Sequence, residues 1–190
     1  RLAAALKIEN FDVLPRPQMG DGFLISDDGN PNTSGAKLLG LATGKLPEIA
    51  RRVESGEITA LMVLGEDAVD CGISEGALKK LEALVCAGIL ANKTTPHASV
   101  VLPTSAWAEK RGTMINLKGR LQRLNQAIQP PGQARDDWEV LRDLVQAAGG
   151  ANGVYTIEEV FKVMASETPA LQGLTISRVG DLGVQLTLPA

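Results

Sequence analysis

The stretch Ala98–Arg123, ASVVLPTSAWAEKRGTMINLKGRLQR, contains the pattern that decides the fold. Its first part, Val100–Leu102, is an apolar run as long as a short buried strand, and Pro103 ends it because proline has no N–H for a strand ladder. Residues 113–116 and 121–124 then predict two extended arms around a turn. The stretch therefore predicts a strand followed by a hairpin, without a catalytic triad, a metal knuckle or a phosphate loop.

Two apolar segments before this stretch predict further strands. Ile58–Leu64 is almost continuously apolar, which is typical of a central parallel strand covered on both faces. Leu84–Leu90 predicts a second strand, and Ser74 predicts the N-cap of a helix that runs to about Ala83 between them. Strand, helix and strand of this length form a crossover unit. The place of the 99–102 strand in the order of the sheet stays open.

The flanking regions differ in their regularity. Residues 1–41 are dense in proline and glycine, which predicts loops, a surface loop at Asn30–Ala36 and one extended piece at Phe23–Ile25. Leu46–Glu54 predicts a helix, with Pro47 near its first position.

Two capping patterns predict helices after the hairpin. Asp136 with Glu139, and Thr156 with Glu159, have the spacing of capping boxes. Short extended segments are expected over residues 174–188. The fold class predicted is α/β, with a parallel-core sheet, flanking helices, a hairpin and a helical tail. We expect three consecutive parts: an irregular N-terminal segment 1–44, an α/β domain with the extended hairpin 45–134, and a helical C-terminal segment 135–190.

The composition is that of an ordinary globular protein. Of 190 residues, 44% are apolar and 22% are charged, enough for one domain or one and a half. A net charge of −3 gives no reason to expect nucleic acid as a partner. No apolar run approaches the about 20 residues that cross a bilayer, so no direct membrane insertion is expected. The sequence begins with Arg1, and we interpret it as a fragment.

The nucleophilic and metal-binding residue types are few. Cys71 and Cys86 lie in no metal spacing; a disulfide is one interpretation, and we favour free thiols in a reducing cytoplasm. His97, the one histidine, is interpreted as structural, because Ser105 lies in no G-x-S-x-G elbow. Trp107 and Trp138 are expected to be core or interface anchors. The sequence thus predicts no catalytic residue and no metal site.

Gly65, Glu66 and Asp67 follow the Ile58–Leu64 strand directly. Ligands of open α/β sheets bind at the carboxyl ends of the strands, so these residues are candidates for a nucleotide or pterin-nucleotide pocket. The alternative is a strand-end turn with solvated carboxylates, since two carboxylates repel a diphosphate and the loop lacks G-x-G-x-x-G or a Walker lysine. On the motif alone, we favour the turn.

The chain nevertheless resembles a known family. V-V-L-P, then A-x-x-A-E-K-x-G-T-x-x-N-x-x-G-R-x-Q-R, then P-P-G-Q-A-R-D-D-W-E-V-L are similar to the molybdopterin oxidoreductase superfamily. Within it, the pattern is most similar to the large iron–sulfur (G) subunit of bacterial NADH:quinone oxidoreductase, respiratory complex I. The resemblance is continuous from about Gly56 to Leu144.

The resemblance implies respiratory electron transfer from NADH toward quinone for the parent, in which this chain is a scaffold without redox centres. The parent would carry iron–sulfur clusters, whereas no cofactor is expected in this chain. The other subunits or domains of a respiratory complex would be its partners, in the peripheral arm on the cytoplasmic side of the membrane. The alternative is a piece of a molybdopterin-dependent oxidoreductase, such as a formate dehydrogenase, that contributes to a pterin guanine dinucleotide site. Gly119-Arg120 is more similar to the G subunit.

The resemblance also identifies where this sequence departs from the molybdenum enzymes. Those enzymes carry a Q-D-x-F-x-T-E-T-type segment that hydrogen-bonds the pterin nucleotide, and residues 87–94 here keep only Thr94 of it. Ser99 stands in place of an aspartate before V-V-L-P. We therefore expect the pocket to be vestigial, with no measurable binding of guanosine nucleotides or pterin. The candidate residues of this vestigial pocket are Gly65, Glu66, Asp67, Gly88 and Thr94.

Overall fold

A computed structural model describes residues 1–150 and 153–188, which form two compact units. The described part of unit 1 comprises residues 1–12, 44–110 and 126–150, and that of unit 2 comprises 13–43, 111–125 and 153–188. Each unit is thus assembled from three separated stretches of the chain. The division into three consecutive parts stays a prediction.

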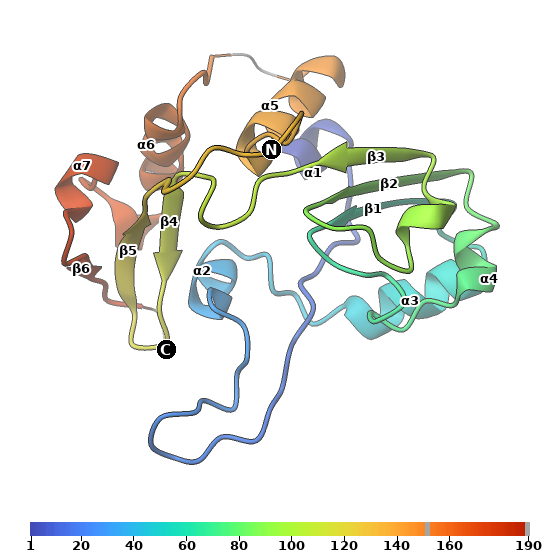
Figure 1. Cartoon of the computed structure of the whole chain (residues 1–190), viewed down its shortest axis with the longest axis horizontal. Coiled ribbons are helices and arrows are strands. Elements are labelled where there is room, and N and C mark those ends of the chain that lie inside the picture. The colour runs from blue at the N-terminus through green and yellow to red at the C-terminus, as the bar shows by residue number, and fades with distance from the viewer. Residues whose placement is uncertain (151–152, 189–190) are drawn as a thin grey trace. The chain divides into compact units, whose positions relative to one another are not determined.

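Unit 1 contains the parallel sheet (Figure 1). Strands β1 (Ala60–Leu64), β2 (Ala83–Gly88) and β3 (Val100–Pro103) are all parallel and lie in the order β1-β2-β3. This order answers the question that the sequence left open for the third strand. The prediction that the Ile58–Leu64 strand is central is wrong, because β3 pairs with the far side of β2 and leaves β1 at an edge.

One face of this sheet packs on the core of unit 1. Helix α3 (Leu46–Glu54), predicted with these bounds, contributes Ile49, Ala50 and Val53 to that core. Alternate residues of β1 and β2 meet it, because side chains of a strand point alternately to its two faces. Among them, Leu84 is 1% exposed. On the other face, Leu64 and Val100 are exposed.

The connection between β1 and β2 contains less helix than predicted. Ser74 is the N-cap, as expected, and its hydroxyl accepts the Ala77 N–H, but helix α4 (Glu75–Leu78) ends well before Ala83. The helix cannot continue because Glu82 and Ala83 already donate to the Thr59 carbonyl and start β2. The second strand ends at Gly88 instead of Leu90.

The remaining elements of unit 1 are helices α1 (Leu2–Ala5), 3₁₀ helix η1 (Thr95–His97) and α5 (Asp137–Ala147). Helices α1 and α5 contact each other. The capping box predicted for α5 is wrong: Asp136 is the N-cap residue, but its carboxylate accepts from the Ser105 hydroxyl and the Trp138 indole. The helix buries Val140.

Unit 2 contains an antiparallel sheet in the order β4-β5-β6. Strands β4 (Gly112–Ile115) and β5 (Arg120–Leu124) form the predicted hairpin, and β6 (Val184–Gln185) adds to the outer side of β5. Helix α2 (Thr33–Leu38) was predicted to be a surface loop. It forms within contact of β4, where the Asn32 side chain accepts the Ile115 N–H at 2.8 Å.

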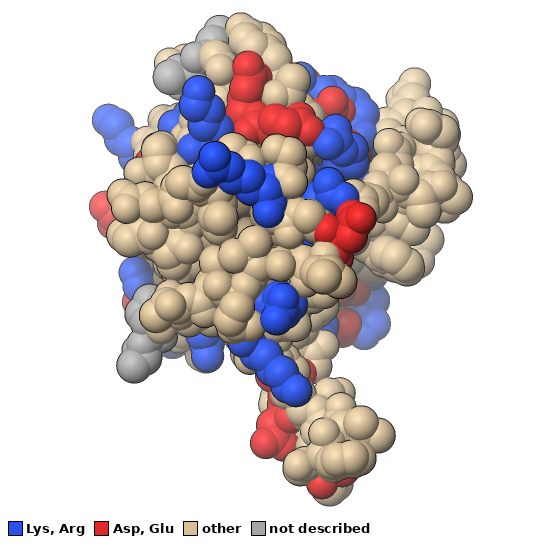
Figure 2. Space-filling model, turned by 90° about the vertical axis from the view of Figure 1, so that its left-hand side faces the viewer, with Lys and Arg blue, Asp and Glu red and all other residues tan. Residues whose placement is uncertain are grey.

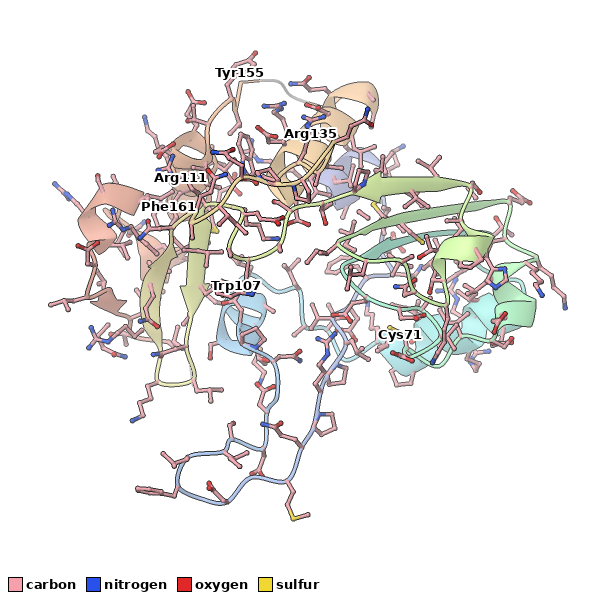
Figure 3. The ribbon with its side chains drawn as sticks, in the orientation of Figure 1. Cys71, Trp107, Arg111, Arg135, Tyr155 and Phe161 are labelled. Atoms are coloured by element: carbon pink, nitrogen blue, oxygen red, sulfur yellow. The ribbon has the colours of Figure 1, made fainter. Side chains whose placement is uncertain are left out.

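The C-terminal part of unit 2 completes its core. Helix α6 (Ile157–Glu167) has the capping box predicted for Thr156 and Glu159, and it buries Phe161, labelled in Figure 3. After it come η2 (Pro169–Leu171) and α7 (Ile176–Val179), and α7 lies within residues 174–188, where the sequence predicted extended segments. The core that they share with the hairpin contains the following buried residues: Ile115, Leu121, Phe161, Ala165, Leu171, Ile176, Val179 and Leu186.

The predicted fold class is confirmed: parallel sheet, antiparallel hairpin and helices are all present. Within residues 1–150 and 153–188, no helix has the length and apolar character needed to cross a membrane.

Candidate functional site

The candidate residues meet at the carboxyl edge of β1 and β2, within unit 1. Gly65 follows β1 and donates its N–H to the Ala87 carbonyl of β2 at 2.7 Å, which extends the parallel pairing by one residue. Its φ of +69° bends the chain out of the sheet, in the left-handed region that favours glycine. The loops after β1 and β2 therefore leave the sheet side by side.

Asp67 ties these two loops together. Its carboxylate accepts from the Thr94 hydroxyl at 2.7 Å, from the Lys93 N–H at 2.9 Å and from the Val69 N–H at 3.0 Å. Burial raises the pKa of Asp67, but these three hydrogen bonds outweigh burial and hold the pKa below its ordinary value. Asp67 is thus an ionised clamp and not a solvated turn residue.

Thr94 is the buried counterpart of this clamp. It is 0% exposed, and its hydroxyl oxygen also accepts the Ala68 N–H at 2.7 Å while it donates to Asp67. The hydroxyl therefore satisfies one donor and one acceptor away from water, as buried polar groups require. Thr94 holds the loop after β1 in place from the loop after β2.

Asn92 is a member of this network that the sequence analysis missed. Its amide nitrogen donates to the Glu66 carbonyl at 3.0 Å, and its amide oxygen accepts from the backbone of Thr94 and from Thr95. The sequence did contain a sign of this role, because Asn92 with Thr94 and Thr95 two and three residues later is a pattern typical of turns in which a side chain bonds the backbone. Its bond to Glu66 joins residues 26 positions apart and could not be read from that pattern.

The structure brings all five predicted residues to one edge and also shows what remains free for a ligand. A Cβ at Gly65 would meet nothing within 4 Å, and one at Gly88 would meet only the Leu90 carbonyl, at 3.9 Å. Beyond Gly88, Ile89 and Leu90 are 56% and 83% exposed. The edge thus offers open backbone and apolar side chains, while the polar side chains of Asp67, Asn92 and Thr94 are engaged with the protein. These residues fit the wall of a nucleotide site that would hold its ligand mainly through shape and backbone.

Ser99 takes a structural role at the position where the sequence analysis expected an aspartate in the molybdenum enzymes. Its N–H donates to the Leu84 carbonyl at 2.7 Å, and its hydroxyl accepts the Leu84 N–H at 3.1 Å. The side chain thereby occupies the start of the β2–β3 ladder.

The thiol of Cys86 is not activated. Cys86 is buried, and burial, followed by the charge of Asp67, raises the pKa of its thiol, which opposes thiolate formation. Cys71 is half-buried in the loop between β1 and α4 (Figure 3). Cys71 and Cys86 form no disulfide with each other, as the favoured interpretation of the sequence had it.

The histidine and serine considered as catalytic candidates do not meet. The His97 imidazole lies 3.1 Å from the Glu75 carboxylate, and the Ser105 hydroxyl donates to Asp136 at 2.8 Å. Among residues 1–150 and 153–188, no group of three or more His, Cys, Asp or Glu side chains could hold a metal ion.

The tryptophans behave differently from each other. Trp107 is 68% exposed, so it is not a core residue. Trp138 is half-buried, donates to Asp136 at 3.3 Å and lies under the Arg142 guanidinium, 5.4 Å from the ring centre. The core alternative is therefore wrong for Trp107, which leaves the interface alternative for it.

The chain matches known proteins over most of its length. The sequence profile of the family Molybdopterin oxidoreductase matches residues 19–147. The F420-dependent formate dehydrogenase 1 subunit alpha of Methanococcus maripaludis is 36% identical over 134 residues, which are 67% of this chain and 20% of that protein. The NADPH-Fe(3+) oxidoreductase subunit alpha of Geobacter sulfurreducens is 36% identical over 141 residues, 72% of this chain and 17% of that protein.

The fold has a counterpart among solved structures. Acetylene hydratase from Pelobacter acetylenicus superimposes with a TM-score of 0.57 at 17% identity, over 76% of this chain and 21% of that one. Its identity is low, so it supports the fold alone. The chain spans about a fifth of the length of these proteins. Since the family profile covers more than half of the chain, the protein belongs to the molybdopterin oxidoreductase family.

Proposed function

We propose that this chain is a segment of a molybdopterin-dependent oxidoreductase of the formate dehydrogenase type, in which the carboxyl edge of β1 and β2 forms one wall of a pterin guanine dinucleotide site. The observation that carries the proposal is the meeting of the loops after β1 and β2 at the sheet edge where α/β proteins bind ligands. The names of the relatives, formate dehydrogenase alpha subunits among them, support the type of oxidoreductase.

Within such a site, this chain would act through shape and backbone. Gly65 and Gly88 leave space beside the strand ends, and the exposed Ile89 and Leu90 would cover an apolar surface of a ligand. Asp67 and Thr94 would keep the two loops at a fixed separation, so that the wall is preorganised. When bound, the molybdenum–pterin group supplies the redox chemistry; this chain would contribute no catalytic side chain.

Space at Gly88 provides the test. The change Gly88→Val puts a side chain into the open edge, and valine suits the end of a strand. In the full-length oxidoreductase we expect at least a fivefold loss of molybdenum per chain, measured by elemental analysis, and a matching loss of the guanine nucleotide released on denaturation. The control is Gly112→Val, at the start of β4, where an added Cβ meets nothing within 4 Å. Normal molybdenum content in Gly88→Val would refute the wall.

A second function is favoured by one specific observation, the internal engagement of Asp67, Asn92 and Thr94. An edge that satisfies its own polar groups suits a scaffold without a cofactor, as predicted from the resemblance to the G subunit of complex I. Gly119-Arg120 adds less to this alternative, because Gly119 has a φ of +76° and the β4–β5 turn itself favours glycine there. Full-length protein with iron but no molybdenum or pterin would establish the scaffold and exclude the first proposal.

The partners expected for this chain differ between the two proposed functions. Several relatives are named as alpha subunits, so we propose that the parent works with other subunits. A place in the cytoplasmic arm of a respiratory complex stays a prediction of the sequence.

A further inference from the structure

The loop at residues 15–30 of unit 2 exposes large apolar side chains at its end. We name residues 19–25 the tip. Met19, Phe23 and Leu24 are 91%, 88% and 81% exposed, and Ile25 is 52% exposed. The loop extends away from the elements of unit 2 in Figure 1, and its end is mostly tan in Figure 2. Most exposed apolar residues of proteins stand singly, whereas these four are gathered on one loop.

The tip is ordered by its own hydrogen bonds. One oxygen of the Asp21 carboxylate accepts the N–H groups of Phe23, Leu24 and Ile25, at 2.9, 2.7 and 2.7 Å. Below the tip, the Gln18 N–H donates to the Asp27 carbonyl at 2.9 Å. The conformation that displays the apolar side chains is thus held by local bonds. Binding through it requires little further ordering, which lowers the entropic cost of association.

Gly20 shows that this conformation is tightly packed at one point. A Cβ there would lie 2.6 Å from the Asp27 carboxylate and 2.7 Å from the Ile25 carbonyl. Glycine lets the two sides of the loop approach, and the Gly20 N–H donates to Asp27 at 2.9 Å.

The charge of the loop and the exposed apolar area of the tip indicate which kind of surface the tip binds. Residues 17–28 carry three aspartates and no lysine or arginine, so tips of two copies repel each other and anionic lipid repels the tip. Four such side chains expose roughly 500 Å² of apolar surface, on the scale of about 150–250 Å² for an aromatic side chain. Stable complexes between separate proteins bury about 800 Å² on each partner. A contact of the smaller size is stable when both sides belong to one polypeptide, because linkage raises the effective concentration.

We propose that the tip docks into an apolar pocket with lysine or arginine at its rim, on the part of the oxidoreductase polypeptide outside residues 1–190. This inference rests on the proposed function, under which the chain acts within a longer protein, as the lengths of its relatives suggest. The tip lies inside the region that the family profile matches, which begins at Met19.

Thiol labelling at the tip tests the docking. Met19→Cys, in a Cys71→Ser and Cys86→Ala background, is expected to react with a maleimide as fast as a free thiol in the 190-residue chain. In the full-length oxidoreductase we expect it to react at least tenfold more slowly, and the further change Leu24→Asp should restore the fast rate. Leu182→Cys, at a position 86% exposed, is the control: Leu24→Asp should not alter its rate.

Any of the following results would overturn the proposal. Equal labelling rates in the 190-residue chain and the full-length protein would show that nothing covers the tip. Protection of the 190-residue chain that rises with its own concentration would assign the tip to a second copy. Binding to phosphatidylcholine vesicles, lost in Leu24→Asp, would assign it to a membrane. Normal molybdenum content together with fast labelling of the full-length Met19→Cys variant would reject the docking and leave the proposed function intact.

Discussion

Replacing Thr94 by valine tests the clamp between the two loops at the sheet edge. The change keeps the shape of the side chain but removes the hydroxyl that donates to Asp67 and accepts from the Ala68 N–H. A hydrogen bond to a charged group contributes about 1.5–3 kcal/mol, and a buried unpaired N–H costs about 1–3 kcal/mol. Ala68 is 1% exposed, so water cannot replace the lost partner.

The added methyl group offsets part of this loss, by about 0.8 kcal/mol for a buried CH₂-sized group. We therefore expect Thr94→Val to lower the free energy of unfolding of unit 1 by roughly 2–4 kcal/mol, a large share of the about 5–15 kcal/mol typical of native proteins. Urea unfolding followed by circular dichroism measures the change. The comparison is valid if the slope of the free energy of unfolding against urea concentration is the same in both proteins.

Two further variants separate the hydroxyl from general effects of substitution. Thr94→Ser keeps the hydroxyl and should cost only about 1 kcal/mol, for one lost methyl group. Thr59→Val changes an exposed threonine just before β1 and should alter stability by less than about 0.5 kcal/mol. If Thr94→Val unfolds at the same urea concentration as Thr59→Val, the Thr94 hydroxyl does not hold the loops and the reasoning is wrong.

Unit 1 also allows two shorter tests. The pKa of Asp67 is lowered in the folded state, so the contribution of Asp67 to stability is present above the unfolded pKa and is lost as the pH falls through the folded pKa. Asp67→Asn should therefore make the stability of unit 1 less dependent on pH in the acid range, and an unchanged pH dependence would contradict the clamp. Leu84→Ala, at a side chain 1% exposed, should cost about 2–5 kcal/mol in urea unfolding, whereas Val100→Ala, at a position 46% exposed, should cost much less; equal costs would contradict the assignment of the covered face.

Sequence reasoning identified the strands but not all of their neighbours. The apolar run Ile58–Leu64 placed β1 within two residues of its observed start, because a strand that packs on a core must be apolar. Its position at the edge depends on β3, which pairs with β2, and nothing within the run records that choice. Helix α2 was missed for a similar reason, since the Asn32 side chain that adjoins it is held by Ile115, 83 residues away.

The candidate site, like the fold, could be predicted from the sequence only in part. Gly65 and Asp67 could be placed from the strand that precedes them, because residues that follow a parallel strand emerge at its carboxyl edge. The charge state and function of Asp67 could not, because its partners Lys93 and Thr94 come from the next loop along the chain. The sequence suggested a solvated carboxylate, and the structure shows one engaged by three hydrogen bonds.

The interleaved chain path has a consequence for synthesis on the ribosome. The outer side of β5 is covered by β6 through the pairs Arg120↔Gln185 and Leu121↔Val184. About 60 residues separate the partners, so at about 5–20 residues per second β5 waits roughly 3–12 s for β6 to emerge. During that interval its unpaired N–H and C=O groups can pair with other nascent chains. Arg120 and Arg123 on β5 place positive charge along this strand, and like charges on neighbouring chains oppose such pairing until β6 arrives.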